Sequence, residues 1–356
     1  MRRRFLLGLG ALVGLVLFAA SGFLLWRESE LGRPVPEPRS AEDRYLSIAK
    51  GDSFAAVARR LRAQRWVGSA LLLRWEARRS GWDRRIFPGY YRWQRGETVR
   101  DLLARLARGE IDEAKVTIPE GWRAERILRV LADSAGVPLD ALTRLASDSA
   151  WLARHDVPGP GIEGYLLPDT YRIPRGDEPE ALLLRMITPG QEYFRDSLAV
   201  AAQRANLSAR EIWTLASIVE MEAARAEERP QIAAVFRNRL RLGMRLESDP
   251  TVLYALGRPP GRVLYADLEV VSPYNTYRNV GLPPGPICCP GKASLRAVLH
   301  PAPGLEALFF VARGDGSHVF SATFAQHRSA IRAIRDRQRR DRATPEGTRV
   351  AKPSEP

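Results

Sequence analysis

Two glutamates stand in a stretch that is otherwise apolar, and their carboxyl groups are the first candidates for chemistry. Glu220 and Glu222 end the segment 215–222, which reads LASIVEME. Apolar residues on most sides of a helix would remove such a carboxyl group from water, which raises its pKa. A carboxyl group that stays protonated near neutral pH can act as a general acid.

The helix that carries both glutamates can be placed from its start signal. Ser208 and Glu211 have the spacing of a capping box, in which each side chain satisfies a backbone N–H at the helix start. The spacing predicts a helix from near Ala209 to about Ala226.

The two glutamates point to different sides of this helix. At about 100° per residue, Glu222 lies about 200° further round than Glu220, so the two cannot serve one site equally. Arg225 follows Glu222 at a spacing that allows an ion pair, whereas Ala224 offers no partner to Glu220. Spacing therefore favours Glu220 as the catalytic residue, with a structural ion pair as the alternative for any single buried glutamate.

The composition is that of a globular protein with an unusual excess of arginine. The 356 residues are enough for two ordinary domains, 45% of them are hydrophobic, and the net charge is +14. No zinc, helix-turn-helix or aromatic RNA-binding motif accompanies the charge, so we expect no nucleic-acid partner. An anionic membrane or cell-wall polymer suits this charge better.

The N-terminus has the pattern of a membrane anchor. Arg2–Arg4 precedes an uncharged run, Phe5–Trp26, which as a helix would span about 33 Å. The arginines predict a cytoplasmic N-terminus, a single span of the cell (inner) membrane and a periplasmic or otherwise extracytoplasmic catalytic part. A signal peptide cleaved near Ala19–Ser21 is the alternative, but the apolar run continues beyond it to Trp26.

Cysteine and histidine give no indication of a metal or cofactor. Cys288 and Cys289 are the only cysteines, and a disulfide between neighbours would be strained. The four histidines show no metal-ligand spacing with them. We predict small packing residues, no metal and no cofactor.

Proline and glycine divide the chain into parts. We predict an α+β fold with an N-terminal transmembrane helix, a LysM-like subdomain and a mixed α/β catalytic domain. The proposed boundaries are 1–27 for the N-terminus and anchor, 28–44 for a spacer, 45–114 for the subdomain, 115–337 for the catalytic domain and 338–356 for a charged, disordered tail.

The predicted subdomain contains two similar stretches. Tyr45–Val67 and Gly89–Gly109 each combine a short strand, a polar turn and a capped helix, at 54–64 and 99–107. The pattern resembles LysM-type modules, which bind N-acetylglucosamine polymers in many proteins. A small packing domain without a ligand is the alternative, because a strand followed by a capped helix is common.

Several loops of the second part combine aromatic rings with polar side chains, as a carbohydrate cleft requires. Gly161–Tyr171 is too rich in glycine and proline for a helix and carries acids between aromatics. Segments 248–254 and 272–277 supply hydroxyls, a carboxylate, an amide and tyrosines. The prolines of Gly281–Ile287 restrict that loop before a ligand arrives. A second helix is predicted from Pro230 to Leu242, ended by Gly243.

Taken in order, the motifs identify a family. Segments 118–121, 163–171, 216–222, 238–252 and 274–287 resemble, in sequence and order, the bacterial YceG-like endolytic murein transglycosylases. The likeness runs from the anchor to about Ile334. It implies that Glu220 is the catalytic residue. Cys288-Cys289 departs from the family pattern, in which a small residue is followed by asparagine or another polar residue.

The resemblance implies cleavage of the β-1,4 bond after N-acetylmuramic acid in nascent peptidoglycan, with 1,6-anhydro ends, which would end strand elongation. Peptidoglycan strands and the membrane are then the partners, with peptidoglycan synthases as candidates. A conventional glycoside hydrolase and a non-catalytic wall-binding anchor are the alternatives. The residues expected to contact substrate are Glu163, Tyr165, Asp169, Tyr171, Ser217, Asp249, Thr251, Tyr254, Tyr274, Asn275 and Tyr277.

Overall fold

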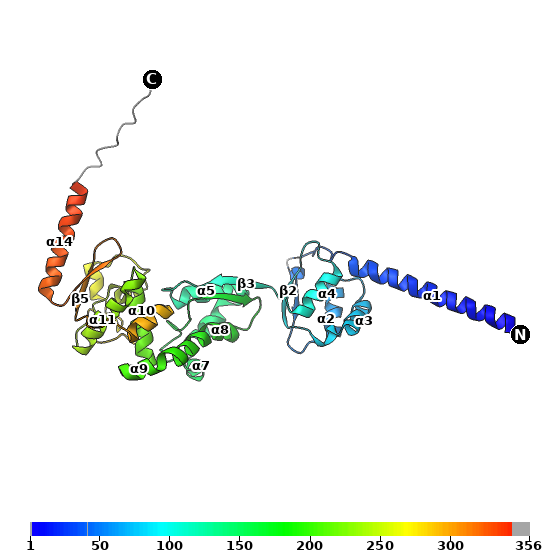
Figure 1. Ribbon diagram of the computed structural model, residues 1–356, viewed down its shortest axis with the longest axis horizontal. Helices are drawn as coiled ribbons and strands as arrows, with labels where there is room; N and C mark the ends of the chain where they lie inside the picture. The colour runs from blue at the N-terminus through cyan, green and yellow to red at the C-terminus, as the bar shows by residue number, and fades with distance from the viewer. Residues whose placement is uncertain (1, 41, 344–356) are drawn as a thin grey trace, which may run out of the picture. The chain divides into compact units, whose positions relative to one another are not determined.

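The computed structural model describes residues 2–40 and 42–343, and it divides the chain into two compact units. The first unit contains Met1–Val116 with two short later segments, Asp133–Val137 and Tyr171–Glu178. The second contains Thr117–Ala132, Pro138–Thr170 and the chain from Pro179 onward. Helices combine with two-stranded sheets, so the predicted α+β class is confirmed (Figure 1).

The first unit begins with one long helix and continues with short elements. Its elements are α1 (Arg2–Gly32), β1 (Tyr45–Ile48), α2 (Phe54–Ala63), α3 (Ala70–Ser80), β2 (Gly89–Arg92) and α4 (Val99–Arg108). The β3 strand (Glu113–Thr117) pairs with β4 (Thr170–Pro174), and both strands lie mainly in this unit.

The two similar stretches of the sequence form one folded body. β1 pairs antiparallel with β2, from Tyr45 opposite Arg92 to Ile48 opposite Gly89. The two stretches thus belong to one body, because each short strand needs the other to satisfy its backbone. The predicted helix starts are confirmed, since side chains cap both α2 and α4. The intervening helix α3 was not predicted.

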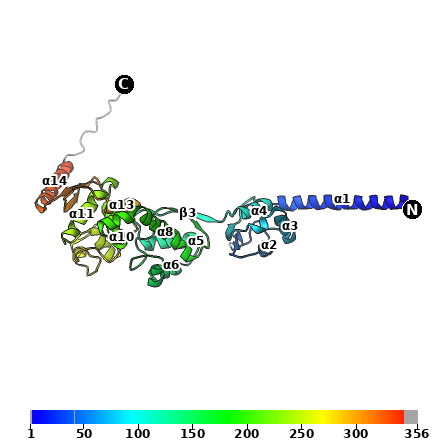
Figure 2. The same cartoon turned by 60° about the horizontal axis from the view of Figure 1, so that its bottom comes forward.

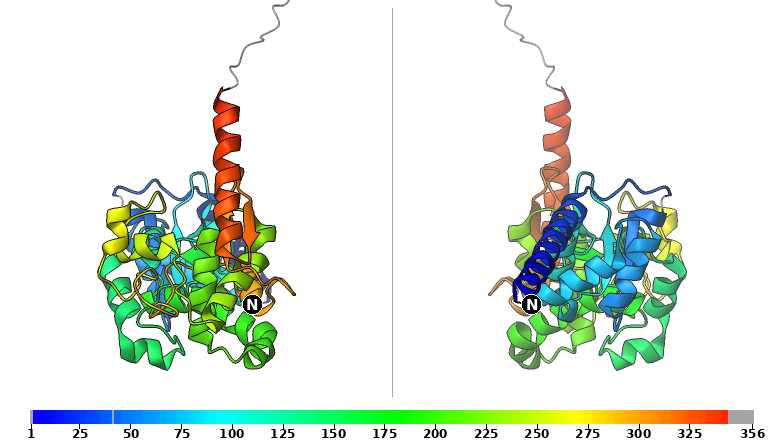
Figure 3. Two further views of the ribbon diagram at one scale, coloured as in Figure 1. Left: turned by 90° about the vertical axis from the view of Figure 1, so that its left-hand side faces the viewer. Right: turned by 90° about the vertical axis from the view of Figure 1, so that its right-hand side faces the viewer.

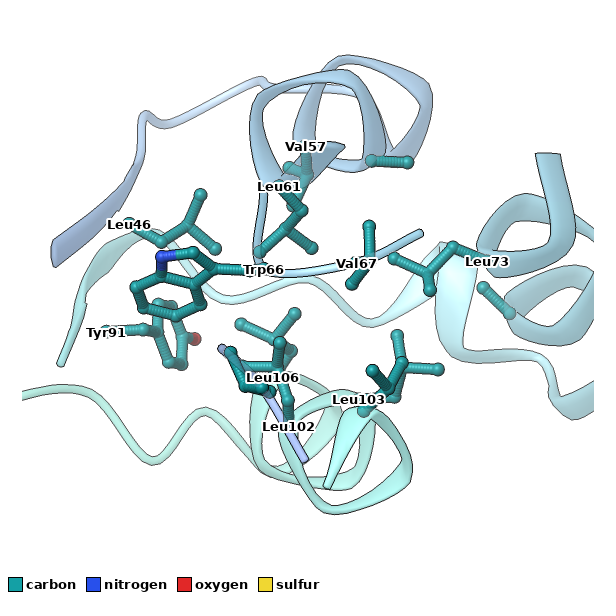
Figure 4. Close-up of a cluster of buried hydrophobic side chains, with 14 of the residues drawn as sticks. Leu46, Val57, Leu61, Trp66, Val67, Leu73, Tyr91, Leu102, Leu103 and Leu106 are labelled. Atoms are coloured by element: carbon teal, nitrogen blue, oxygen red, sulfur yellow. The ribbon is translucent and has the colours of Figure 1, made fainter. Parts of the chain in front are cut away.

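One hydrophobic core holds this body together. Trp66 and Tyr91 are completely buried in it, with Leu61 of α2 and Leu106 of α4 beside them (Figure 4). Leu31 and Val35 belong to the same core, so the C-terminal end of α1 is anchored in the first unit.

The α1 helix meets the requirements for a membrane span in length and composition. Its segment Leu9–Gly32 is 24 residues long and apolar, and none of its most apolar window is buried in the protein. One such helix near an N-terminus fits a single-pass anchor.

The second unit is mainly helical, and its central helix carries the two glutamates. Its elements are α5 (Ala124–Ala135), α6 (Leu139–Ser147), α7 (Ser149–Arg154), α8 (Pro179–Tyr193), α9 (Ala199–Ala205), α10 (Ala209–Glu222), α11 (Arg229–Arg241), α12 (Asp249–Ala255), α13 (Lys292–Leu299), β5 (Phe309–Ala312), β6 (His318–Ser321) and α14 (Phe324–Ala343). Figure 2 shows α10 and α13 side by side, and both pack against α11.

The predicted start of α10 is confirmed, and its predicted end is wrong. Ser208 and Glu211 form the capping box. The helix stops at Glu222, four residues before Ala226, because Ala223 adopts an extended backbone. The next helix, α11, agrees with the predicted range to within one residue at each end, and Gly243 follows it with the positive φ of a helix stop.

The C-terminal region ends on a hairpin and a helix. β5 and β6 pair antiparallel, and α14 packs against both before it extends away from them (Figure 3). The helix reaches Ala343, so the first residues of the predicted disordered tail are helical. Residues 344–356 lie outside the described part of the chain.

Candidate active site

Glu220 lies near the end of α10 with its carboxyl group enclosed by three donors. Arg229 donates to Oε1 at 2.8 Å, while the Gly291 backbone N–H and the Ser294 hydroxyl donate to Oε2 at 3.0 and 2.8 Å. Only 6% of the Glu220 side chain is exposed. The carboxyl group is therefore held in one orientation by neighbouring elements.

Two helix starts supply these donors. Arg229 is the first residue of α11, and Gly291 directly precedes α13, which contributes Ser294 from its first turn. The first N–H groups of a helix have no partner within it and carry partial positive charge. The end of α10 thus meets the positive end of α13, an arrangement that suits a carboxylate.

A second carboxyl group shares Arg229. Glu120 accepts a hydrogen bond from the Arg229 guanidinium at 3.1 Å, and 45% of its side chain is exposed. Desolvation raises the pKa of Glu120, and the nearby charge of Glu220 raises it further. Glu120 lies in segment 118–121, for which the sequence alone predicts no role. Because 100 residues separate Glu120 from Glu220 along the chain, spacing does not indicate that the two lie close together.

A short loop links these groups to Glu163. Gly121 N–H donates to the Cys289 carbonyl at 2.9 Å, and Cys289 N–H donates to the Trp122 carbonyl at 2.8 Å. Glu163 accepts from the Ala124 N–H at 2.9 Å, at the start of α5. Desolvation raises the pKa of Glu163 to about 7. Both cysteines are free and buried in this region.

Glu222 occupies a different environment from Glu220. Ser248 donates its hydroxyl to Glu222 at 2.6 Å, and desolvation raises the pKa of Glu222 to about 7. The ion pair predicted with Arg225 is absent, since Arg225 instead donates to the Asp315 carbonyl. Because α10 ends at Glu222, Arg225 does not occupy the next turn of the same helix.

Predicted aromatic and acidic contact residues gather in two groups. The rings of Tyr254 and Tyr274 lie 4.8 Å apart. Burial raises the pKa of each tyrosine, and the charge of Glu163 adds to the effect, so these three groups are neighbours. Separately, Tyr277 donates its hydroxyl to the exposed Asp249 carboxylate at 2.7 Å.

Three residues that the sequence predicts to contact substrate are buried and form hydrogen bonds within the protein. Ser217 is completely buried and accepts the Ile287 N–H at 3.0 Å, which fixes the proline-rich loop to α10. Thr251 is buried against Thr276 at 2.8 Å. Asn275 is also buried and donates to backbone carbonyls of its own loop. These hydrogen bonds hold the loops around the site in place.

The remaining loop residues are dispersed. Tyr165 is buried, with its ring 5.4 Å from that of Trp213. Asp169 is exposed and accepts the N–H of Thr170. Tyr171 lies in the first unit, so the second unit alone does not contain it. Among the residues that the structure describes, no three His, Cys, Asp or Glu form a metal-binding group.

Comparison with known proteins identifies the family of this chain. The profile of the YceG-like family matches residues 46–333, which include Glu220 and all its hydrogen-bond donors. The chain belongs to the YceG-like family.

Relatives of this YceG-like chain carry consistent names. An "Endolytic murein transglycosylase" of Bacillus subtilis is 31% identical over 318 residues, 84% of this chain and 88% of the relative. A protein of the same name from Streptococcus pneumoniae is 31% identical over 265 residues, 66% of this chain and 48% of the relative. The crystal structure of a yceG-like protein of Listeria monocytogenes, 28% identical, matches with a TM-score of 0.56 over 80% of this chain and 98% of the other.

Proposed function

We propose that this chain is an endolytic lytic transglycosylase that cuts the β-1,4 bond between N-acetylmuramic acid and N-acetylglucosamine in nascent peptidoglycan. The relative from Bacillus subtilis, which bears that activity in its name and aligns over most of both chains, is the observation that carries the proposal. Cleavage within a strand would end its elongation.

In the proposed reaction Glu220 acts first as acid and then as base. The protonated carboxyl group gives its proton to the glycosidic oxygen as the bond from that oxygen to C1 of the muramyl residue breaks. The carboxylate then removes the proton from the muramyl C6 hydroxyl while O6 bonds to C1. The product is a 1,6-anhydro end, water is not consumed, and Glu220 regains its proton.

The shared arginine supports this double role. Oε2 of Glu220 is fixed by two donors from the start of α13, the Gly291 N–H and the Ser294 hydroxyl, whereas Oε1 accepts from Arg229. Arg229 also binds Glu120, which offers it a second anion when Glu220 carries the proton. We infer that Glu120 is a positioning residue that holds Arg229 through the cycle.

A conventional hydrolase is the second candidate, because other carboxyl groups lie close to the site. Such an enzyme uses two carboxyl groups, one of them protonated near neutral pH. Glu163, with its pKa of about 7, could be that acid, and Asp249 is exposed enough to act as the other. A non-catalytic wall-binding protein would need neither.

The first unit would place this chemistry at the membrane. We propose that α1 spans the inner membrane, with the N-terminus in the cytoplasm and the second unit outside it. The LysM-like body formed by β1, α2, α3, β2 and α4 would hold a glycan strand for the second unit. Peptidoglycan synthases, which make such strands, are the proposed protein partners.

The products distinguish these functions. The full chain, purified in detergent, is incubated with uncrosslinked glycan strands, and the fragments are identified by mass spectrometry. We expect new ends that carry 1,6-anhydro-N-acetylmuramic acid and arise within strands. Reducing ends would instead establish a hydrolase, and intact strands that remain bound to the protein would establish a binding protein.

A further inference from the structure

The exposed face of α3 combines large apolar side chains with arginines. Leu71 is 75% exposed and Trp75 is 44% exposed, which is unusual for side chains of this size on a globular surface. Arg74, Arg78 and Arg79 are exposed as well, and together the five residues follow the spacing of one helix face. Tryptophan is favoured at the boundary between lipid and water, where a neighbouring arginine can lay its apolar stem on the lipid and extend its charged head to the headgroups.

This helix packs against the end of α1, as Figures 1 and 2 both show. The rings of Phe23 and Trp75 meet edge to face, with 5.5 Å between their centroids. Arg27 forms an ion pair with the buried Glu76 at 2.8 Å, and Arg79 binds the same carboxylate at 3.0 Å. The two helices are thus fixed to one another by both apolar and charged contacts.

The contact with Phe23 sets the depth of α3. Phe23 belongs to the apolar segment Leu9–Gly32, three residues before Trp26, the end of the uncharged run. A side chain in ring contact with Phe23 lies at the same depth as the last turns of that run. If α1 spans the bilayer, Trp75 must therefore reach the boundary between lipid and water, where tryptophan is favoured.

We propose that α3 docks on the surface of the membrane from which α1 emerges, with Leu71 and Trp75 among the lipid chains and the arginines on anionic headgroups. This inference rests on the proposed membrane anchor. It gives the first unit a second attachment to the bilayer, which would fix its height and orientation. A glycan strand held by that unit would then lie at a defined distance from the membrane.

Site-specific labels on the full chain test the proposal. Leu71→Cys is labelled with a fluorophore and the protein is reconstituted into phosphatidylcholine vesicles that contain phosphatidylglycerol and nitroxide-labelled lipid. The native cysteines are completely buried, so labelling is confined to the new thiol. The control is Arg59→Cys, an exposed position on α2. We expect several-fold stronger quenching by the lipid at 71 than at 59.

A third label separates the two hypotheses. Val16→Cys, exposed in the middle of α1, reports on the anchor itself. Strong quenching at 16 with equal, weak quenching at 71 and 59 would overturn the docking of α3 and leave the anchor intact. No quenching at 16 would remove both. A label at 71 shielded from lipid and from iodide in water would mean that protein, such as a second copy, covers α3, which also overturns the proposal.

The arginines are tested by the lipid composition. We expect the joint change Arg74→Gln and Arg78→Gln to reduce quenching at 71 in vesicles with phosphatidylglycerol to the level found in phosphatidylcholine alone. Arg79 is retained because it also binds Glu76. Equal quenching in both lipids for the unchanged protein would refute the role of anionic headgroups.

Discussion

Replacing Glu220 by glutamine removes the transferable proton and little else. The amide oxygen can still accept from Gly291 N–H and Ser294, which hold Oε2 at 3.0 and 2.8 Å. The amide NH2 then faces the Arg229 guanidinium, donor against donor. Glu220→Gln is therefore a nearly isosteric change with one defined electrostatic cost.

The two effects of this change have different sizes. Loss of general acid–base catalysis should lower the rate at least about a hundredfold, which is about 2.7 kcal/mol of activation free energy. Breaking a buried ion pair outright costs about 3–5 kcal/mol of stability. Arg229 keeps Glu120 as a partner at 3.1 Å, so we expect a loss of only about 1–3 kcal/mol, close to that of one charged hydrogen bond.

The assay compares Glu220→Gln with Glu222→Gln as full chains in detergent. Release of anhydro-muramyl fragments gives the rate, and the thermal unfolding midpoint reports stability. Glu222→Gln should keep its contact with Ser248 and most of its activity, because Glu222 contacts none of the donors that surround Glu220. A folded Glu220→Gln protein with undiminished cleavage would refute the mechanism and direct attention to Glu163 or Asp249.

Three further changes probe the same region. The raised pKa of Glu222, about 7, means that the folded protein binds the proton more tightly than the unfolded chain, so stability is lost as pH rises from about 4.5 through 7. Unfolding midpoints measured at about pH 5 and 8 should fall with pH, and less so in Glu222→Gln. Glu120→Gln should lower kcat and shift its pH profile with KM little changed, since Glu120 holds Arg229. Gly291→Ala should displace Glu120 from Arg229 and so reduce kcat, because the new Cβ would lie 1.8 Å from Glu120 Oε1 and that half-exposed side chain can move away; an unchanged kcat would contradict the positioning role of Glu120.

Helix starts could be predicted from the sequence because their signals are local. Ser208 and Glu211 satisfy each other's backbone regardless of the remaining fold, and the structure shows that bond pattern. The α3 helix also has local signals, since Ser69 caps its start and Gly81 follows its end, but its hydrophobic residues do not form one buried face. Its buried face includes the charged Glu76, while its exposed face carries Leu71 and Trp75, so apolar residues occur on both sides. Contacts with the neighbouring α1 helix explain the burial of Glu76 and the position of Trp75.

The position of Glu220 could be predicted, but its partners could not. Ser294 and Arg229 reach it from the starts of two other helices, and Glu120 approaches from a turn 100 residues earlier in the chain. Such contacts depend on how helices pack, which spacing along the chain does not encode. The same limit explains the mistaken pairing of Arg225, which assumed that α10 continues past Glu222.

A raised pKa alone would point to Glu163 or Glu222 as the catalytic acid, since a pKa near 7 is common among catalytic acids. Each of these two carboxyl groups, however, accepts a hydrogen bond from a neighbouring segment: Glu163 from Ala124 at the start of α5, and Glu222 from Ser248 just before α12. A neutral carboxyl group is the less costly form at such a buried junction, so the shift needs no catalytic explanation. Glu220 differs because it shares a cation with a half-exposed second acid, Glu120, and its surroundings can respond when it gains or loses a proton. That responsiveness is what a residue acting as acid and then base requires.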